Sequence, residues 1–194
     1  MIWSKYVDEI AKCLLSLAVS GADAKPLDNE IAFAIWNDLT VQARGDKKTI
    51  FLIGNGASAS MASHVAADLA KNAHVHTEVF TDLALITAIA NDISFEEVFA
   101  EPLRRRLKAG DILVAISSSG KSANILSAVQ TTKKLGGRVI TLSAMSADNP
   151  LRQGGELNFY VPAQSYGMAE TCHAALLHFW IDKIVSATKQ PFRI

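Results

Sequence analysis

The sequence has little cysteine and no long apolar run. Only two of its 194 residues are cysteine, Cys13 and Cys172, and they lie far apart within helix-like patterns. We expect both to be buried free thiols in a reducing compartment rather than a disulfide. No stretch of 18 or more apolar residues is present, so no membrane-spanning helix is expected. The N-terminal residues lack the basic-then-apolar order of a signal peptide, which predicts a cytoplasmic protein.

No charge of one sign dominates the chain. Nineteen lysines and arginines balance nineteen aspartates and glutamates, giving a formal net charge of zero. This balance gives no reason to expect nucleic acid or an anionic membrane as a partner. The basic cluster at residues 104–106 is local and is expected to be a solvated helix face. The 49% hydrophobic and 20% charged residues are typical of a globular protein, and the length predicts a single domain over residues 1–194.

The first 47 residues are expected to form a helical segment. Apolar residues recur at helical spacing between residues 2 and 17, and Gly21 and Pro26 interrupt that pattern. A second helical pattern covers residues 31–41 and ends at Gly45. Two apolar helices need a surface to cover, which is either the sheet or the same helices of another subunit.

Residues 48–194 alternate between short β-type runs and helical patterns. Five runs are typical of strands: Thr49–Ile53, His76–Phe80, Ile112–Ile116, Arg138–Leu142 and Leu157–Val161. Strands without alternation, separated by helices, indicate a parallel sheet covered on both faces. The sequence therefore predicts an α/β fold, a three-layer αβα sandwich with a five-stranded parallel sheet, preceded by two N-terminal helices.

Three helices and one loop of this core carry their own signals. Ser94 and Glu97 have the spacing of a capping box before a helix over residues 95–107, and Pro102 is expected to kink or shorten that helix. The remaining predictions are helices over Asn124–Leu135 and Met168–Thr188 and a loop over residues 143–156.

A serine-rich turn follows the third predicted strand. Three serines and a glycine, Ser117–Gly120, separate the strand from a helical pattern, with Ser122 as a candidate N-cap. Free backbone N–H groups and the helix dipole at such a position favour an anion, above all a phosphate. Gly120 lets the backbone approach that anion closely. The alternative is a serine-rich turn with an ordinary cap.

A glycine-rich turn, residues 54–58, follows the first predicted strand and also leads into a helix. Gly54, Gly56 and Ala59 satisfy the G-x-G-x-x-A pattern of dinucleotide-binding proteins. That pattern also requires an acidic residue at the end of the next strand, and Glu78 is expected to lie within the strand instead. We therefore expect no nucleotide. Both turns follow strands of one parallel sheet, so they can face a common crevice.

Taken together, the two turns resemble the sugar isomerase (SIS) domain family and, within it, the phosphoheptose isomerases. The similarity covers nearly the whole chain, and its motifs are Gly54–Ser58, Asn91-Asp92 with Phe95 and Val98-Phe99, Ile116–Ile125, and Glu170, His173 and His178 of the last helix. The resemblance implies an aldose–ketose isomerase that acts on sedoheptulose 7-phosphate or a related sugar phosphate through an enediol. It further implies a role in heptose synthesis for lipopolysaccharide or capsule, and a homotetramer with active sites at subunit interfaces.

The resemblance also assigns roles to individual residues. The phosphate would be held by Ser117, Ser118, Ser119 and Ser122, and the substrate would be contacted by Asn55, Gly56, Ser58, Asp92 and Glu170. Asp68 would be the catalytic base and His178 the acid, which are residue types suited to moving a proton between C1 and C2. A zinc ion would be bound by His64, Asp68, Glu170 and His178, a set of nitrogen and oxygen donors.

Two residues depart from the family pattern. Asp68 replaces a glutamate, which shortens the side chain by one methylene, and Glu170 replaces a glutamine, which adds a negative charge. Either the catalytic pair is retuned, or the site favours a metal more strongly, or the heptose reaction is lost. Without the resemblance, His64 and Asp68 are ordinary helix-surface residues, and His173 and His178 are semi-buried residues of an amphipathic helix.

Two other functions remain open at this point. One is a non-catalytic SIS protein, such as an adaptor that binds a bacterial replication initiator, although an adaptor has no need of His178 and two acidic groups. The other is a sugar-phosphate-sensing regulator. Such regulators carry an N-terminal helix-turn-helix domain, and the about 48 residues before the first strand are too few and not basic.

Overall fold

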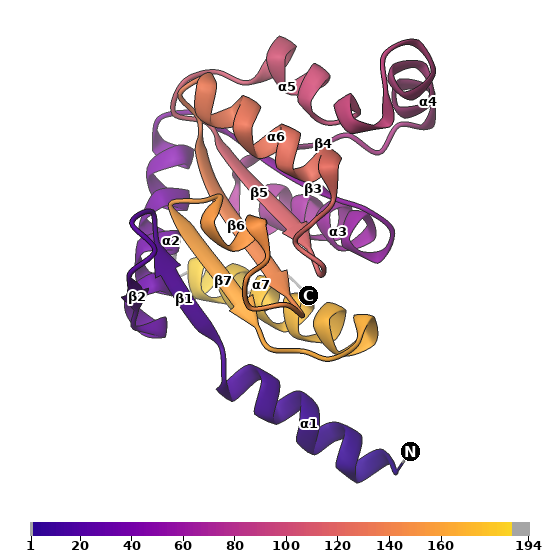
Figure 1. The fold of residues 1–194 in the computed structure, drawn as a ribbon. Helices are drawn as coiled ribbons and strands as arrows, with labels where there is room; N and C mark the ends of the chain where they lie inside the picture. The colour runs from indigo at the N-terminus through magenta and orange to yellow at the C-terminus, as the bar shows by residue number, and fades with distance from the viewer. Residues whose placement is uncertain (1, 188–194) are drawn as a thin grey trace.

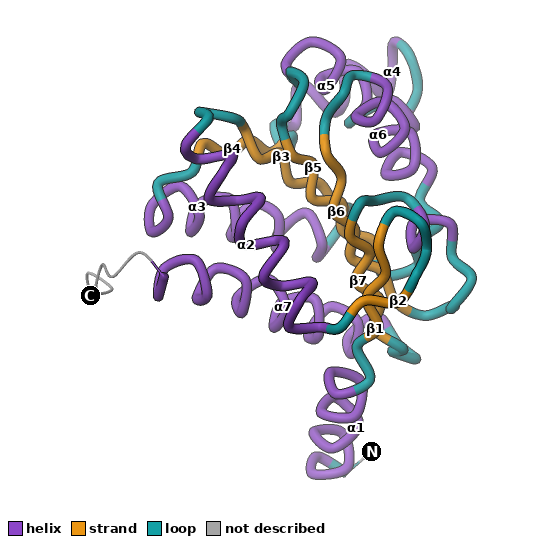
Figure 2. The backbone as a smooth tube through the Cα atoms, turned by 90° about the vertical axis from the view of Figure 1, so that its left-hand side faces the viewer, coloured by secondary structure: helices purple, strands orange, loops and turns teal. Residues whose placement is uncertain are grey.

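The computed structural model describes residues 2–187, which form a sheet covered by helices on both faces (Figures 1 and 2). The sheet has the strand order β2-β1-β7-β6-β5-β3-β4. Its five parallel strands are β3 (Thr49–Gly54), β4 (His76–Val79), β5 (Ile112–Ser117), β6 (Arg138–Ala144) and β7 (Leu157–Val161). These agree with the five predicted strands to within two residues at each end, and the α/β fold is confirmed.

The sheet contains seven strands rather than the predicted five. An antiparallel hairpin, β1 (Ala18–Gly21) and β2 (Pro26–Leu27), adds to the edge of β7. Gly21 and Pro26 were expected only to end a helix, but they flank the turn of this hairpin. The Asn158 amide of β7 also donates to the carbonyls of Ser20 and Gly21. Such short edge strands escape prediction because tertiary pairing with β7, not their own pattern, defines them.

Helices cover the two faces in separate groups. The first face is covered by α2 (Asn29–Gly45), α3 (Ala57–Ala73) and α7 (Tyr166–Ala187), and the second by α4 (Leu83–Asp92), α5 (Ala100–Arg106) and α6 (Ala123–Lys134) (Figure 2). The remaining helix, α1 (Trp3–Leu15), projects away from the sheet (Figure 1). Thr188, the predicted last residue of α7, lies outside the described residues. None of the described helices is both long enough and apolar enough to cross a membrane.

The predicted helix over residues 95–107 is divided in two. A 3₁₀ turn, η1 (Phe95–Glu97), precedes α5, and the Ser94 side chain makes no capping hydrogen bond, so the predicted capping box is wrong. Pro102 is the third residue of α5. Because proline has no N–H to donate, it is tolerated in the first turn of a helix but not in its interior, and α5 begins just before it. A second 3₁₀ turn, η2 (Pro150–Gln153), lies in the predicted loop over residues 143–156, whose first two residues extend β6.

Aromatic residues fix α7 against the first face of the sheet. Trp36 of α2 stacks on Trp180 of α7 with ring centroids 4.2 Å apart, and Phe159 of β7 lies 4.9 Å from Trp36. The indole Nε1 of Trp180 donates to Thr40 Oγ1 at 3.0 Å. All four side chains are buried. This packing sets the rotation of α7, and therefore which of its residues face α3 and the ends of the strands.

Candidate active site

A polar pocket lies where β3 and β5 end and α3, α6 and α7 begin. Its wall is formed by Asn55, Ser58, Ile116, Ser117, Ser118, Ser119, Ser122, Tyr166 and Glu170. Both predicted turns therefore open into one crevice. We call this crevice the serine pocket. Among the described residues, no lysine or arginine lines it.

The serine turn is held in place by the segment that follows β6. Gly120 has a φ of +62°, and a Cβ at this position would lie 2.0 Å from Asn149 Oδ1. Asn149 is buried and donates to the backbone carbonyls of Ala144 and Ser146. The Leu151 N–H donates to the Gly120 carbonyl at 3.2 Å. Glycine at position 120 is thus required by both the positive φ and the close approach.

The serines of the turn line the pocket, and their printed hydroxyl contacts are local, as where Ser119 Oγ accepts from the Lys121 N–H at 3.3 Å. Ser122 is the N-cap of α6, as predicted, but its side chain makes no capping hydrogen bond. Its Oγ instead lies 3.3 Å from Ser117 Oγ. The Ser122 hydroxyl is therefore directed toward Ser117 at the pocket wall rather than toward an N–H of α6.

The glycine turn brings β3 and α3 unusually close. A Cβ on Gly54 would lie 2.6 Å from backbone and side-chain atoms of Ser58, so only glycine fits there. Gly56 is the N-cap of α3 with a φ of +56°. Asn55 forms a reciprocal pair of hydrogen bonds with Asn124 of α6. Glu78, the acidic residue that a dinucleotide would need, lies within β4 and pairs with Arg106 at 3.1 Å.

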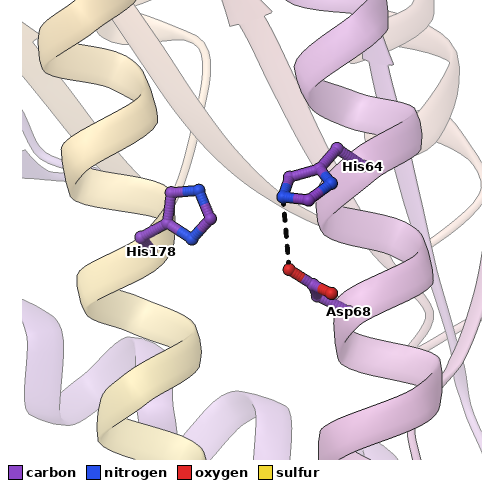
Figure 3. A group of neighbouring side chains, drawn as sticks. All are labelled: His64, Asp68 and His178. Atoms are coloured by element: carbon purple, nitrogen blue, oxygen red, sulfur yellow. Dashed lines mark ion pairs between the residues drawn. The ribbon is translucent and has the colours of Figure 1, made fainter.

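Three of the predicted metal-binding side chains meet between α3 and α7 (Figure 3). His64 Nε2 lies 3.3 Å from Asp68 Oδ2, and the His64 and His178 rings have centroids 5.4 Å apart. One donor atom from each of the three residues lies within 4.8 Å of the others. Two ligands bound to a tetrahedral zinc ion at 2.0–2.1 Å lie about 3.3 Å apart, so this set fits zinc with small side-chain rotations.

The three side chains are accessible from outside the chain. The His64 side chain is 60% exposed and that of Asp68 is 20% exposed, and His178 is exposed as well. Lys71 Nζ lies 3.8 Å from Asp68 Oδ1. Three protein ligands leave one position of a tetrahedral ion open, which is the arrangement of catalytic rather than structural zinc.

Two predicted residues lie apart from this cluster. Glu170 lines the serine pocket and, among the described residues, is not part of the histidine–aspartate group. Asp92 is the exposed last residue of α4, where its carboxylate accepts from Asn91 Nδ2 at 2.9 Å. Within one chain Asp92 does not line the serine pocket, and its predicted contact with substrate stays a prediction.

The pocket and the cluster lie along the same pair of helices. Ten residues separate Ser58 from Asp68 on α3, about 15 Å of helix, and eight separate Glu170 from His178 on α7, about 12 Å. Both helices begin at the serine pocket. A seven-carbon sugar phosphate is extended on this scale, about 10 Å from phosphorus to C1 by standard bond lengths.

Three residues support the site although no role in it is predicted for them from the sequence. Asn124 lies within the Ser-Ala-Asn segment that carried the resemblance, but no role was expected for it. Asn149 lies in the predicted loop over residues 143–156, and a buried asparagine that holds a glycine turn has no sequence pattern of its own. His173 is fully buried and donates through Nε2 to the Ser143 carbonyl at 3.2 Å. Burial lowers the pKa of His173 to about 4, so the side chain is neutral at physiological pH.

Comparison with known proteins gives a consistent result. The sequence profile of the SIS domain matches residues 22–144. The chain is 35% identical over 149 residues to a phosphoheptose isomerase of Streptomyces coelicolor, covering 74% of this chain and 64% of that protein. It is 34% identical over 152 residues to a phosphoheptose isomerase of Campylobacter concisus, covering 75% and 78% of the two chains.

Solved structures show the same relationship. The phosphoheptose isomerase of Neisseria gonorrhoeae superimposes with a TM-score of 0.79 at 28% identity, covering 94% of this chain and 96% of that one. The enzyme from Francisella tularensis gives a TM-score of 0.80 at 25% identity with the same coverage. The fold and the paired turns are thus those of an SIS domain. The chain belongs to the SIS domain family.

Proposed function

We propose that this protein is an aldose–ketose isomerase that acts on sedoheptulose 7-phosphate or a closely related sugar phosphate. One observation carries the proposal: a serine-lined pocket at the N-termini of three helices lies on the same two helices as a cluster of two imidazoles and a carboxylate. The names of the relatives support the same reaction class. A non-catalytic adaptor would have no use for the group of two imidazoles and a carboxylate.

The serine pocket is suited to the phosphate end of the substrate. Ser117, Ser118, Ser119 and Ser122 line it, and α6 begins beside it, so the partial positive charge of this helix N-terminus favours an anion there. Because no cationic side chain of the described residues lines the pocket, neutral hydroxyls, backbone donors and helix dipoles supply the attraction. Glu170 also lines the pocket, but its negative charge does not attract a phosphate. Its carboxylate is better suited to accept hydrogen bonds from sugar hydroxyl groups.

Asp68 and His178 are suited to the proton transfers at the other end. Isomerisation removes a proton from one of the carbons C1 and C2 and returns it to the other, while oxygen atoms gain and lose protons through an enediol. A carboxylate serves as the base and an imidazole as the acid. The aspartate is one methylene shorter than the family glutamate, a displacement of about 1 Å that can cost about a hundredfold in rate if the helix does not compensate.

A zinc ion would be held by His64, Asp68 and His178. When bound, it would polarise the carbonyl and stabilise negative charge on the enediolate oxygens. Glu170 was also predicted as a ligand, but its place in the serine pocket supports the substrate-binding role instead. Since Asp68 is both a candidate ligand and the candidate base, the rate is expected to depend on metal content.

Assembly into a homotetramer with active sites between subunits is part of the proposal. The group of candidate metal ligands, His64, Asp68 and His178, is accessible at the surface. Phe179, next to His178, is an exposed aromatic residue. Asp92, predicted to contact substrate, does not reach the serine pocket of its own chain. A neighbouring copy that covers the cluster would bring such a residue to the substrate.

The reaction is tested by proton exchange at C1. Sedoheptulose 7-phosphate and other ketose phosphates are incubated with the protein in D₂O, with and without added zinc, and NMR follows the C1 signal. We expect exchange with at least one substrate. Replacing His178 by Ala should lower the exchange rate by about 10²–10⁴-fold with little change in phosphate binding. A matched variant, His76→Ala on β4, should keep the wild-type rate.

Two outcomes would contradict the proposal. If no ketose phosphate exchanges its C1 proton under either condition, the adaptor function becomes the better explanation. If His178→Ala retains the wild-type rate, the assignment of the acid is wrong even if the protein is an isomerase. Metal analysis of protein purified without chelators tests zinc separately.

A further inference from the structure

A reciprocal pair of asparagine amides joins the two turns of the serine pocket. Asn55 Nδ2 donates to Asn124 Oδ1 at 2.9 Å, and Asn124 Nδ2 donates to Asn55 Oδ1 at 2.9 Å. Asn124 is 2% exposed and lies in the first turn of α6, whereas Asn55 lies between β3 and α3. Asn55 lines the pocket and Asn124 does not. Any effect of Asn124 on a ligand must therefore pass through another residue.

We propose that Asn124 is a positioning residue for the phosphate site. It fixes the orientation of the Asn55 amide and holds the first turns of α3 and α6 together, so that the pocket is formed before substrate arrives. The inference rests on the proposed function, because the ligand that benefits is the phosphate of the substrate. No contact between Asn124 and the ligand is required.

The pairing restrains the plane of the Asn55 amide and limits which of its atoms remain for the ligand. A primary amide has two N–H donors and an oxygen with two lone pairs. The pair uses one donor and one lone pair of each asparagine, so Asn55 keeps one N–H and one lone pair for substrate. Rotation of either amide by 180° would place oxygen against oxygen and nitrogen against nitrogen. Only rotation of both amides together preserves the pair, so the buried Asn124 couples the orientation of the Asn55 amide to its own.

The same pair opposes an electrostatic repulsion in the empty pocket. Each helix N-terminus carries about half a positive charge, and α3 and α6 both begin at the pocket. Two like ends repel each other until an anion lies between them. The amide pair connects these ends directly, and a pocket that is already formed saves the ordering cost that binding would otherwise carry.

The test uses inorganic phosphate as the probe and isothermal titration calorimetry as the measurement. Asn124→Ala is expected to weaken phosphate binding about tenfold, which is within the range of couplings between contacting residues. The control is Gln130→Ala, which removes an exposed amide from the same helix and should leave binding unchanged. The full-length protein is used throughout.

A double-mutant cycle distinguishes positioning from general damage. In an Asn55→Ala background, Asn124 has no partner to position, so adding Asn124→Ala should change phosphate affinity by less than twofold. A further tenfold loss in that background would overturn the proposal. Asn124→Asp is the second variant if the alanine variant does not fold, because it keeps the shape and the acceptor but loses the donor. Asn124→Asp should weaken phosphate binding less in the Asn55→Ala background than in the wild-type protein. An equal loss of affinity in both backgrounds would overturn the proposal.

The outcomes separate this inference from the proposed function. Phosphate binding by wild-type protein with unchanged affinity in Asn124→Ala would contradict the positioning role alone. Absence of phosphate binding by wild-type protein would contradict the phosphate site, and the inference would fall with it. If wild-type protein binds phosphate but exchanges the C1 proton of no ketose phosphate, the isomerase proposal is contradicted. The positioning role of Asn124 would still stand.

Discussion

His173 lies on α7 between Glu170 and His178, and it is the only one of the three that is fully buried. Its Nε2–H donates to the Ser143 carbonyl, while its Nδ1 has no hydrogen-bond partner. A buried acceptor without a partner is destabilising, and protonation of the ring would bury a charge. The residue thus joins α7 to the end of β6, next to the serine turn, and its burial favours the neutral ring.

The burial of His173 predicts a pH-dependent stability. Its pKa falls from 6.5 to about 4 on folding, so the unfolded chain binds the proton more tightly between these values. Stability is full above pH 6.5 and declines as the pH falls toward 4, by about 3 kcal/mol for this group. Urea unfolding of wild type and His173→Gln at several pH values measures the difference.

The comparison with His173→Gln isolates this group from the carboxylates, which titrate in both proteins. The free energy of unfolding of the variant should fall less steeply between pH 6.5 and 4. His76→Gln, which changes an exposed histidine, should retain the wild-type slope. Equal slopes in wild type and His173→Gln would contradict the assignment.

At the scale of elements, the serine turn depends on its support from the β6–η2 segment. Asn149 fills the space beside Gly120, and backbone hydrogen bonds run from Ala144 to Ser118 and from Leu151 to Gly120. The geometry that presents the hydroxyls therefore comes from a segment far along the chain. Most of the pocket wall is formed where β3 and β5 end and α3, α6 and α7 begin, so small changes in these turns should matter more than changes within the helices.

Gly120→Ala is predicted to distort the pocket. The added Cβ would meet Asn149 and adopt a strained positive φ, so we expect a loss of about 1–3 kcal/mol of stability and weaker phosphate binding. Gly45→Ala at the end of α2 is the matched control, because a Cβ there meets nothing within 4 Å. Urea unfolding and phosphate titration of both variants test this, and Gly120→Ala with wild-type values in both would show that the turn is not constrained.

At the scale of the whole molecule, α1 is a helix whose side chains are mostly exposed. Trp3 is 77% exposed, and Ile2, Val7 and Leu15 are exposed as well, so only Cys13 of this helix is buried. Figure 1 shows α1 extending away from the sheet. An apolar helix in this position is consistent with the proposed tetramer, in which helices of other subunits would cover it.

Charge on this helix is predicted to disrupt assembly. We expect wild-type protein to have the mass of a tetramer by light scattering after size-exclusion chromatography. The double variant Trp3→Glu with Val7→Glu should form smaller species and lose most of its C1 exchange activity, while its circular dichroism remains that of a folded protein. Leu135→Glu, at the exposed apolar C-cap position that follows α6, is the control. A monomeric wild type, or a variant that remains tetrameric, would contradict the prediction.

The sequence by itself determined the elements whose patterns are local. The strands β3 and β5 are nearly continuous apolar runs, and β5 is buried at every residue, so their type and order followed from their own hydrophobic pattern. The two turns followed from glycine and serine at strand ends. The two cysteines are buried free thiols, as expected, and burial raises the pKa of Cys172 to about 11.

Only the tertiary structure decided the features that depend on contacts between distant segments. The β1–β2 hairpin exists because β7 offers an edge, and α5 begins where it does because Pro102 must lie in a first turn. The Asn55–Asn124 pair, the contact of Asn149 with Gly120 and the approach of His178 to His64 join residues that are 29 to 114 positions apart. Hydrophobic periodicity reports which residues are buried, but it does not report which buried or polar groups face one another.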